Sequence, residues 1–249
     1  HSASDLLTSI VVLIGFKISS SPADEKHPYG HGRIEFIATL VIAVMLLFVG
    51  IEFAKAAYGR FMTNAAVKGN FLVAIIILAT AVFKEWMARF SIELGMRIDS
   101  PALIADAWHH RTDGISSVLV AIALIASKYG YYRADAVLGI GVSALVAYTG
   151  FTIAKDSISK LIGEVPSEEE VEEIKIIALQ VPGVLGVHKI KVHDYGAFRE
   201  ISLHIHVNHK LSIIEAHDIS DQVEQAIEAK LNAKATVHTE PLRHYKRAK

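Results

Sequence analysis

Two histidine–aspartate pairs with the same spacing are the residues of this chain best suited to chemistry. His1 and Asp5 are four residues apart in HSASD, and His109 and Asp113 are four residues apart in HHRTD. On a helix this spacing stacks an imidazole and a carboxylate on one face, where both can bind the same ion. Two such helices packed together would offer two nitrogens and two oxygens to a divalent cation.

Both pairs occur in sequence that is otherwise apolar. The 249 residues are 52% hydrophobic and 20% charged, and the mean hydropathy is +0.37, which is more apolar than a typical soluble domain. Ionisable side chains at membrane depth are costly and usually functional, which favours a metal site over the alternative of simple helix-end ion pairs. The sequence therefore predicts a membrane protein that moves a metal ion.

The long apolar stretches predict five membrane helices in the first two thirds of the chain. They cover residues 2–20, 33–58, 68–94, 102–127 and 134–161. The chain enters the first of them directly, so residues upstream are expected to be missing, and a helix among them would raise the count from five to six. Lys84, Glu85 and Arg89 fall late in the third helix, where internal pairing or snorkelling to the interface explains them without a transport role.

A small α+β domain is predicted after these helices, so that residues 1–163 form a transmembrane transport domain and residues 164–249 a separate domain. Capping boxes that begin at Ser167 and Ser212 predict two helices. Alternating apolar residues predict three strands, at 184–193, 201–207 and 235–238. The order αββαβ is typical of a ferredoxin-like fold that lacks one edge strand.

Composition and motifs argue against several functions. With a net charge of −1, the chain has no electrostatic footprint for nucleic acid. It contains no cysteine, so any metal must be held by histidine and carboxylate. An enzyme is disfavoured, because there is no HExxH motif and four protein ligands leave no open position for water. A membrane metal sensor that does not transport stays as an alternative.

Four motifs in this order resemble the cation diffusion facilitator family over nearly the whole chain. They are HSASDLL, PADEKHPYGHGRIE, ADAWHHRTDGISS and the tail pattern GVH…HIHV…AHDISDQVEQAI…VHTEP. The resemblance implies a homodimeric exporter of divalent metal ions that crosses a lipid bilayer and uses protons as counter-ions. It implies six transmembrane helices per protomer, the first of them absent from this chain, with the C-terminal domain in the cytoplasm. The inner or plasma membrane is the expected location.

The same resemblance places further metal ligands outside the membrane helices. The loop after the first helix supplies Asp24, His27 and His31, for which solvated loop residues are the alternative. The ligands implied in the C-terminal domain are His188, His204, His217, His238 and Glu240, the last of which stands where some members have aspartate. Alternation independently places His204 on the face opposite the apolar core. The histidines predicted to face solvent are His193, His206, His209 and His244.

Zinc is the predicted ion. Imidazoles and carboxylates satisfy a tetrahedral zinc ion, whereas magnesium and calcium prefer oxygen alone. Protons can displace the ion, because the ligands must be deprotonated to bind it. Cadmium, iron(II), cobalt and manganese are the alternatives, and manganese would favour a site richer in oxygen.

The prediction also covers two residues beside His109 on the fourth helix and one charge pair outside the site. Asp106, one turn before His109, is expected to orient that imidazole, while His110 packs elsewhere. Some members of the family pair a base at the position of Arg33 with an acid near the end of the last membrane helix, but Ile162 and Gly163 stand at the expected place of that acid here. The candidate acids are Asp156 and Glu164.

Overall fold

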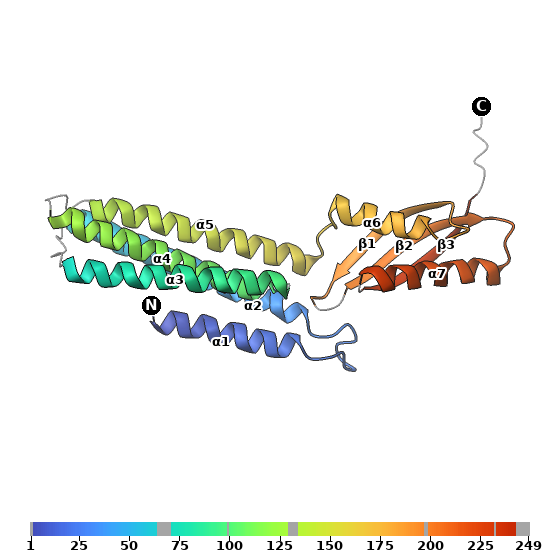
Figure 1. Ribbon diagram of the computed structural model, residues 1–249, viewed down its shortest axis with the longest axis horizontal. Helices are drawn as coiled ribbons and strands as arrows, with labels where there is room; N and C mark the ends of the chain where they lie inside the picture. The colour runs from blue at the N-terminus through green and yellow to red at the C-terminus, as the bar shows by residue number, and fades with distance from the viewer. Residues whose placement is uncertain are drawn as a thin grey trace, which may run out of the picture. The chain divides into compact units, whose positions relative to one another are not determined.

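The computed structural model of the protein describes residues 2–63, 71–98, 100–128, 134–196, 199–231 and 233–242 (Figure 1). These residues form two compact units. The first contains the chain up to Ser19 and from Ile34 to Leu161, and the second contains Ser20–Arg33 together with the chain from Ile162 onward. The loop Ser20–Arg33 thus belongs to the same unit as the C-terminal domain.

The first unit is a set of long helices that lie side by side (Figure 1). They are α1 (Ser2–Ser19), α2 (Arg33–Thr63), α3 (Phe71–Arg97), α4 (Pro101–Lys128) and α5 (Ala134–Ile162). The predicted helical stretches are confirmed, although the start expected at residue 68 lies outside the described residues. α2 continues beyond the predicted end at residue 58, because a single Gly59 is tolerated inside a helix and Arg60 and Met62 after it favour helix.

Small residues bring helices of the first unit into close contact. A Cβ atom at Gly50 in α2 would lie 3.1 Å from the backbone nitrogen of Ala147 in α5. One at Gly150 in α5 would lie 3.0 Å from the carbonyl oxygen of Ala43 in α2. Membrane helices pack through such close backbone approach, since lipid supplies no hydrophobic drive between them. The apolar core of this unit contains Ile42, Leu46, Ala105, Val142 and Val146.

The outer faces of these helices are strongly apolar. In α3, Val82, Trp86 and Phe90 are 72%, 61% and 60% exposed. Two helical segments among the described residues, Arg33–Met62 and Ala136–Ile162, are long and apolar enough to cross a membrane. Exposed apolar side chains of this size suit contact with lipid chains better than contact with water.

The second unit contains the predicted αββαβ order, which is confirmed. Its elements are α6 (Glu168–Leu179), β1 (Gly186–Asp194), β2 (Arg199–Asn208), α7 (Ile213–Leu231) and β3 (Lys234–Leu242). The sheet order is β1–β2–β3, with β1 antiparallel and β3 parallel to β2. Leu203 and Ile205 of β2 share one core with Ile174 of α6 and Ile227 of α7, so both helices cover the same face of the sheet.

The last strand is longer than predicted. β3 pairs with β2 as far as Asn208↔Leu242, whereas the sequence indicated an end at His238. Pro241 has no backbone donor, but β3 is an edge strand, where proline is tolerated. The extension places Glu240 in the sheet, opposite His206.

β1 carries a bulge. Its pairing register with β2 shifts between His188 and Lys191, and Lys189 has a left-handed φ of 52°. Val187 before the bulge and Ile190 after it both pack against the core. Strict alternation would put these two residues on opposite faces, so the extra residue in the strand is what allows the arrangement.

Both predicted serine caps begin helices of the C-terminal domain, and the full capping box forms at α7, whereas at α6 the Glu170 carboxylate contacts Arg199. Ser167 Oγ accepts a hydrogen bond from the backbone nitrogen of Glu170 at 3.1 Å. At α7, Glu215 N donates to Ser212 Oγ at 3.2 Å, and Ser212 N donates to Glu215 Oε2 at 2.7 Å. The backbone hydrogen bond from Ser212 lowers the pKa of the Glu215 carboxyl.

Candidate metal sites

Half of the predicted transport site is formed on α4. His109 and Asp113 are 3% and 4% exposed, and Nε2 of the histidine lies 3.9 Å from Oδ2 of the aspartate. Their four-residue spacing stacks them one turn apart. A tetrahedral zinc ion bound at about 2.0–2.2 Å holds its ligand atoms roughly 3.4 Å apart. A small shift would therefore let both side chains bind one ion.

The other half of this predicted site belongs to α1. His1 and the side chain of Asp5 lie outside the described residues. α1 packs against α4, and Thr8, one turn after Asp5, is fully buried. A helix so placed can present ligands to the face that carries His109 and Asp113, and the four-ligand shell stays a prediction.

A lysine of α3 contacts the aspartate of the pair. Lys84 Nζ lies 2.6 Å from Asp113 Oδ2. α3 and α4 lie close together at Gly114, where a Cβ atom would make ordinary van der Waals contacts, 3.4 Å from the carbonyl oxygen of Ala81 and 3.7 Å from Cβ of Lys84. Sequence reasoning gave Lys84 no transport role, but its partner in the structure is a candidate metal ligand.

The Lys84–Asp113 pair lines a cavity of about 410 Å³ within the first unit. Three residues with hydroxyl groups, Thr80, Ser116 and Ser117, line the same cavity. Each hydroxyl donates its proton to a carbonyl oxygen of its own helix. The lone pairs of these oxygens can still accept hydrogen bonds, so a mostly apolar cavity offers a few polar positions beside the candidate site.

Asp106 pairs with a different histidine from the expected one. Its Oδ2 lies 3.4 Å from Nε2 of His110, and both side chains are buried. The two residues are four positions apart on α4, the spacing that also brings His109 and Asp113 together. The expectation that Asp106 orients His109 is therefore wrong.

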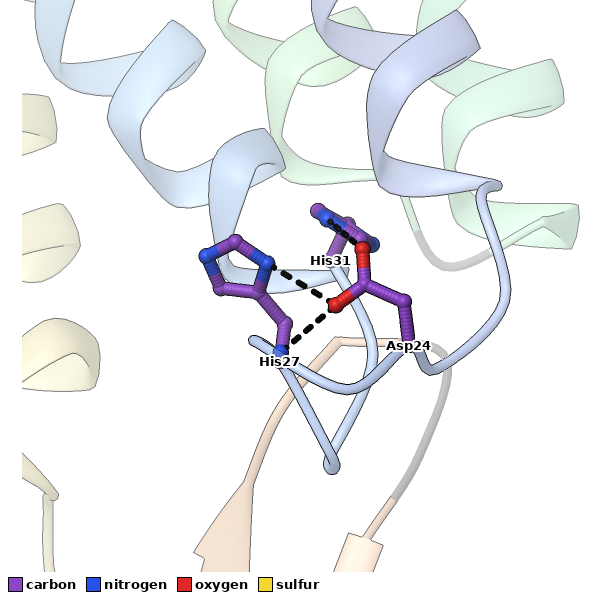
Figure 2. Close-up of side chains that lie close together, drawn as sticks. All are labelled: Asp24, His27 and His31. Carbon is purple, nitrogen blue, oxygen red and sulfur yellow. Dashed lines mark hydrogen bonds and ion pairs between the residues drawn. The ribbon is translucent and has the colours of Figure 1, made fainter.

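The three ligands predicted in the loop between α1 and α2 lie together (Figure 2). Asp24 Oδ1 accepts a hydrogen bond from the backbone nitrogen of His27 at 2.7 Å and lies 3.3 Å from its Nδ1. Asp24 Oδ2 lies 3.6 Å from His31 Nε2. The backbone hydrogen bond from His27 lowers the pKa of the Asp24 carboxyl. One ligand atom of each residue lies within 4.8 Å of the others, so the three can close on one ion.

A tight turn brings the two histidines of this loop together. Gly30 N donates to the carbonyl oxygen of His27 at 3.0 Å, and Gly30 has a φ of 82°, a conformation that glycine adopts readily. The reversal leaves the ring centroids of His27 and His31 4.5 Å apart. The side chains of Asp24 and His27 are more than half exposed, so ions in solution can reach them.

The same loop is anchored on the turn between β1 and β2. Tyr29 stacks on Tyr195 with ring centroids 4.7 Å apart. Arg33 Nε donates to the carbonyl oxygen of Asp194 at 3.3 Å, and its guanidinium lies 4.2 Å from the centroid of the Tyr195 ring. Within the described part of this unit, Glu164, one of the acids expected to pair with Arg33, makes no ion pair with it.

The polar face of the C-terminal sheet gathers four histidines around one glutamate. The register pairs His188 with His204 and His204 with His238, and it pairs His206 with Glu240. These positions share one face, so the rings and the carboxylate meet there. Two groups form, His188/His206/Glu240 and His204/His238/Glu240, each with ligand atoms within 4.8 Å of one another.

Glu240 is common to both groups. Its Oε1 accepts from His204 Nδ1 at 2.7 Å, and its Oε2 lies 3.2 Å from His188 Nε2 and 3.6 Å from His206 Nε2. The hydrogen bond from His204 lowers the pKa of Glu240 to about 2. A charged carboxylate with one oxygen directed to each group can bridge two metal ions.

The cluster differs from the expected ligand set at two positions. The sequence predicts that His206 faces solvent, yet it lies against Glu240 and its ring stacks on His188 with centroids 4.5 Å apart. Its alternation with His204 on β2 is the signal that could have identified it. His217 lies apart on α7, where it is exposed and 3.5 Å from Asp221, so it does not join the cluster of its own protomer.

Comparison with known proteins identifies two domain families in this chain. The cation efflux transmembrane domain matches residues 1–162, and the cation efflux protein cytoplasmic domain matches residues 166–242. An uncharacterized transporter of Methanocaldococcus jannaschii is 39% identical over 241 residues, which cover 96% of this chain and 85% of that protein.

Two further relatives have names that describe their biology. The magnetosome protein MamB of Magnetospira sp. is 32% identical over 241 residues, covering 96% of this chain and 81% of that protein. The cation-efflux pump FieF of Klebsiella pneumoniae is 29% identical over 230 residues, covering 90% of this chain and 74% of that protein.

The matched family consists of membrane-embedded transporters that export divalent metal ions and carry a cytoplasmic domain. Its two domains follow each other in the order found here, a helical part and then an αββαβ domain. With a transmembrane domain match that covers most of its length, this chain belongs to the cation diffusion facilitator family.

Proposed function

We propose that this protein exports zinc in exchange for protons, by alternating access at a site made of His1, Asp5, His109 and Asp113. The observation that carries the proposal is the buried His109–Asp113 pair, one turn apart on α4 and separated by 3.9 Å. Burying an imidazole beside a carboxylate at membrane depth is costly, and ionisable groups kept there are usually functional. The packing of α1, which carries the second predicted pair, against α4 supports a shared site.

The donor set supports zinc among the divalent ions. Two imidazoles and two carboxylates fill a tetrahedral shell, which zinc accepts without added water. Magnesium and calcium would require more oxygen ligands than this face of α4 offers. Cadmium, iron(II) and cobalt accept similar ligands, and manganese prefers more oxygen, so these ions are the competitors to be tested.

Proton coupling follows from the chemistry of these ligands. Imidazole and carboxylate bind metal only in their deprotonated forms, so protonation and metal release are linked. Protons that arrive from one side displace the ion, and the protonated site then returns to the opposite side. Alternating exposure of a site near the bilayer midplane is the general mechanism of such transporters.

The C-terminal domain is proposed to bind zinc in the cytoplasm and to hold two copies of the chain together at the inner or plasma membrane. The ligands on the polar face of the sheet are His188, His204, His206, His238 and Glu240. His217 is exposed on α7 and can reach the cluster of a second copy across a symmetric contact. Zinc held by both copies would strengthen the dimer by linkage.

A weaker zinc site is proposed in the loop between α1 and α2. Asp24, His27 and His31 offer three ligand atoms, which leaves a fourth position for water. The exposure of Asp24 and His27 supports rapid exchange with ions in solution.

Transport by the purified protein in liposomes tests the proposal. Uptake of zinc, cadmium, iron(II), cobalt and manganese would be followed by a metal-sensitive dye inside the vesicles, with and without an acidic interior. Zinc should enter fastest, and dissipating the pH gradient with an ionophore should slow its entry. A non-transporting sensor would bind zinc and move none, and passive conduction would be indifferent to the gradient.

A further inference from the structure

The carboxylate oxygen that faces His109 in the transport site is already held by a lysine. Asp113 Oδ2 lies 3.9 Å from His109 Nε2 and 2.6 Å from Lys84 Nζ. The side chain of Asp113 is 5% exposed and that of Lys84 is 22% exposed. A charge-assisted hydrogen bond of this length is strong in such a place, because the carboxylate is almost completely buried.

We infer that Lys84 is a tethered counter-cation of the transport site: its ammonium group neutralises Asp113 while no ion is bound, and it leaves Oδ2 when a divalent cation arrives. The inference rests on the proposed role of Asp113 as a transport ligand. It requires no change in the protonation of Lys84, only a change of partner.

The metal ion and the ammonium group cannot share the oxygen. An ion bound between His109 and Asp113 would lie about 2.0–2.2 Å from Oδ2, while the ammonium nitrogen lies 2.6 Å from the same atom. The two cations would then be no more than about 5 Å apart in a medium of low dielectric, where they repel strongly. The doubly charged ion attracts the carboxylate more strongly, so the ammonium group is the one that moves.

The cavity beside the pair can receive the displaced ammonium group. Lys84 and Asp113 line it together with Thr80, Ser116 and Ser117, and the cation Arg60 lines it as well, so the ammonium group must settle on the hydroxyl-bearing side. The flexible stem of lysine lets Nζ swing away from the carboxylate while α3 stays in place. The hydroxyl oxygens can accept hydrogen bonds from it, so the charge keeps polar partners in both positions.

A counter-cation of this kind sets how tightly the site holds its cargo. In the empty site Asp113 remains paired, which avoids the cost of an uncompensated buried carboxylate. An incoming ion must replace the ammonium group, so its apparent affinity is lower, and the return of the ammonium group favours release. A singly charged ion gains too little to displace Lys84. The residue therefore tunes both turnover and the selection of divalent over monovalent cations.

A lysine that merely ties α3 to α4 would give different kinetics, and this difference is the test. Zinc uptake into liposomes would be measured for the full chain and for Lys84→Met, Lys84→Arg, Asp113→Ala and Lys55→Met. Lys55 forms an exposed pair with Glu52 at 2.8 Å on α2 and is the matched control. Lys84→Met should lower both KM and kcat by about tenfold, because a repelling unit charge is lost from binding and from release. Lys84→Arg, which keeps the charge, should lower KM and kcat less than Lys84→Met does. Lys55→Met should stay within about threefold of the parent chain.

The outcomes separate this inference from the proposed function. If Asp113→Ala is inactive and Lys84→Met has an unchanged or raised KM, the inference is overturned and the transport site stands. If Asp113→Ala transports zinc at the parent rate, the proposed function fails.

A measurement on the parent chain covers the case in which Lys84→Met does not fold. Labelling by an amine-reactive reagent, read by mass spectrometry, should rise at Lys84 when zinc is added and stay constant at Lys55. In Asp113→Ala the labelling of Lys84 should not respond to zinc. Unchanged or reduced labelling of Lys84 in the parent chain at saturating zinc would overturn the inference.

Discussion

His204 and Glu240 lie on neighbouring parallel strands, and Nδ1 of the histidine is 2.7 Å from Oε1 of the glutamate. The two are not direct register partners, because His204 pairs with His238 and Glu240 pairs with His206. The contact is therefore diagonal, a span that favours a long side chain. Glutamate has one methylene more than the aspartate that some family members carry here, and this length suits the diagonal contact.

The acid stability of an isolated C-terminal fragment, residues 164–249, should depend on this contact. The pKa of Glu240 is about 2 in the folded domain, against an ordinary value of 4.5. A carboxylate whose pKa is lowered by folding contributes stability that is complete above the unfolded value and is lost as the pH falls through the folded value. From about pH 5 to about pH 2, the free energy of unfolding should fall more steeply for the parent fragment than for Glu240→Gln.

Urea denaturation followed by circular dichroism, in the presence of a chelator, measures this difference at each pH. Glu173→Gln changes an exposed glutamate of α6 and is the control, which should follow the parent curve. Parallel curves for the parent fragment and Glu240→Gln would mean that the His204 contact does not persist in solution.

His109→Ala should mainly reduce zinc transport, whereas His110→Ala should mainly reduce the stability of the protein. His109 faces Asp113, whereas His110 lies 3.4 Å from Asp106. Removing a ligand should reduce zinc uptake by more than about 100-fold, since contacts outside the ligand shell alone are worth roughly 10–100-fold. His110→Ala should transport within about tenfold of the parent. It should unfold about 1–3 kcal/mol more easily, because it deprives a buried carboxylate of its partner.

Uptake into liposomes and thermal unfolding in detergent are the two measurements for this pair of variants. Equal uptake by both variants would show that the site on α4 has been misassigned.

His206→Ala should weaken zinc binding to the C-terminal fragment, and His193→Ala should not. His206 belongs to the group with His188 and Glu240, while His193 is exposed on β1 and lies in neither group. Loss of one of three ligands should weaken one binding event by about tenfold or more in calorimetry. Identical zinc titrations of the two variants would mean that His206 is a solvent-facing residue and not a metal ligand.

Zinc should tighten dimerisation of the same fragment, and His217→Ala should remove this effect. His217 stands outside the cluster of its own protomer, so only a second copy can bring it to a shared ion. Sedimentation with chelator and then with zinc measures the monomer–dimer constant, with His209→Ala, an exposed histidine outside both groups, as the control. A constant that does not change in saturating zinc would argue against a metal-linked dimer.

Features that depend on local spacing were predictable from the sequence. The four-residue spacing of His109 and Asp113 determines their common face on a helix. The Ser212–Glu215 capping box identifies the start of α7, because its hydrogen bonds join residues only three positions apart. Alternation alone placed His204 outside the core.

Features that depend on packing between distant segments were not predictable in this way. The contact of Lys84 with Asp113 requires the close approach of α3 and α4. The choice of His110 as the partner of Asp106 depends on side-chain direction, since His109 is nearly as close along the helix. His206 meets Glu240 only because β3 continues past His238, which the sequence did not indicate.

The bulge at Lys189 changes which face of the sheet the side chains on either side of it point to. With Ile190 and Val192 turned toward the core, unbroken alternation would bury His188 beneath the helices. The inserted residue reverses the phase of β1, at the cost of a left-handed backbone at a residue other than glycine. His188 consequently emerges beside Glu240, 3.2 Å away. The number of histidines that can bind metal on this face therefore depends on how many residues separate the core residues Val187 and Ile190 in β1, as well as on which residues are histidine.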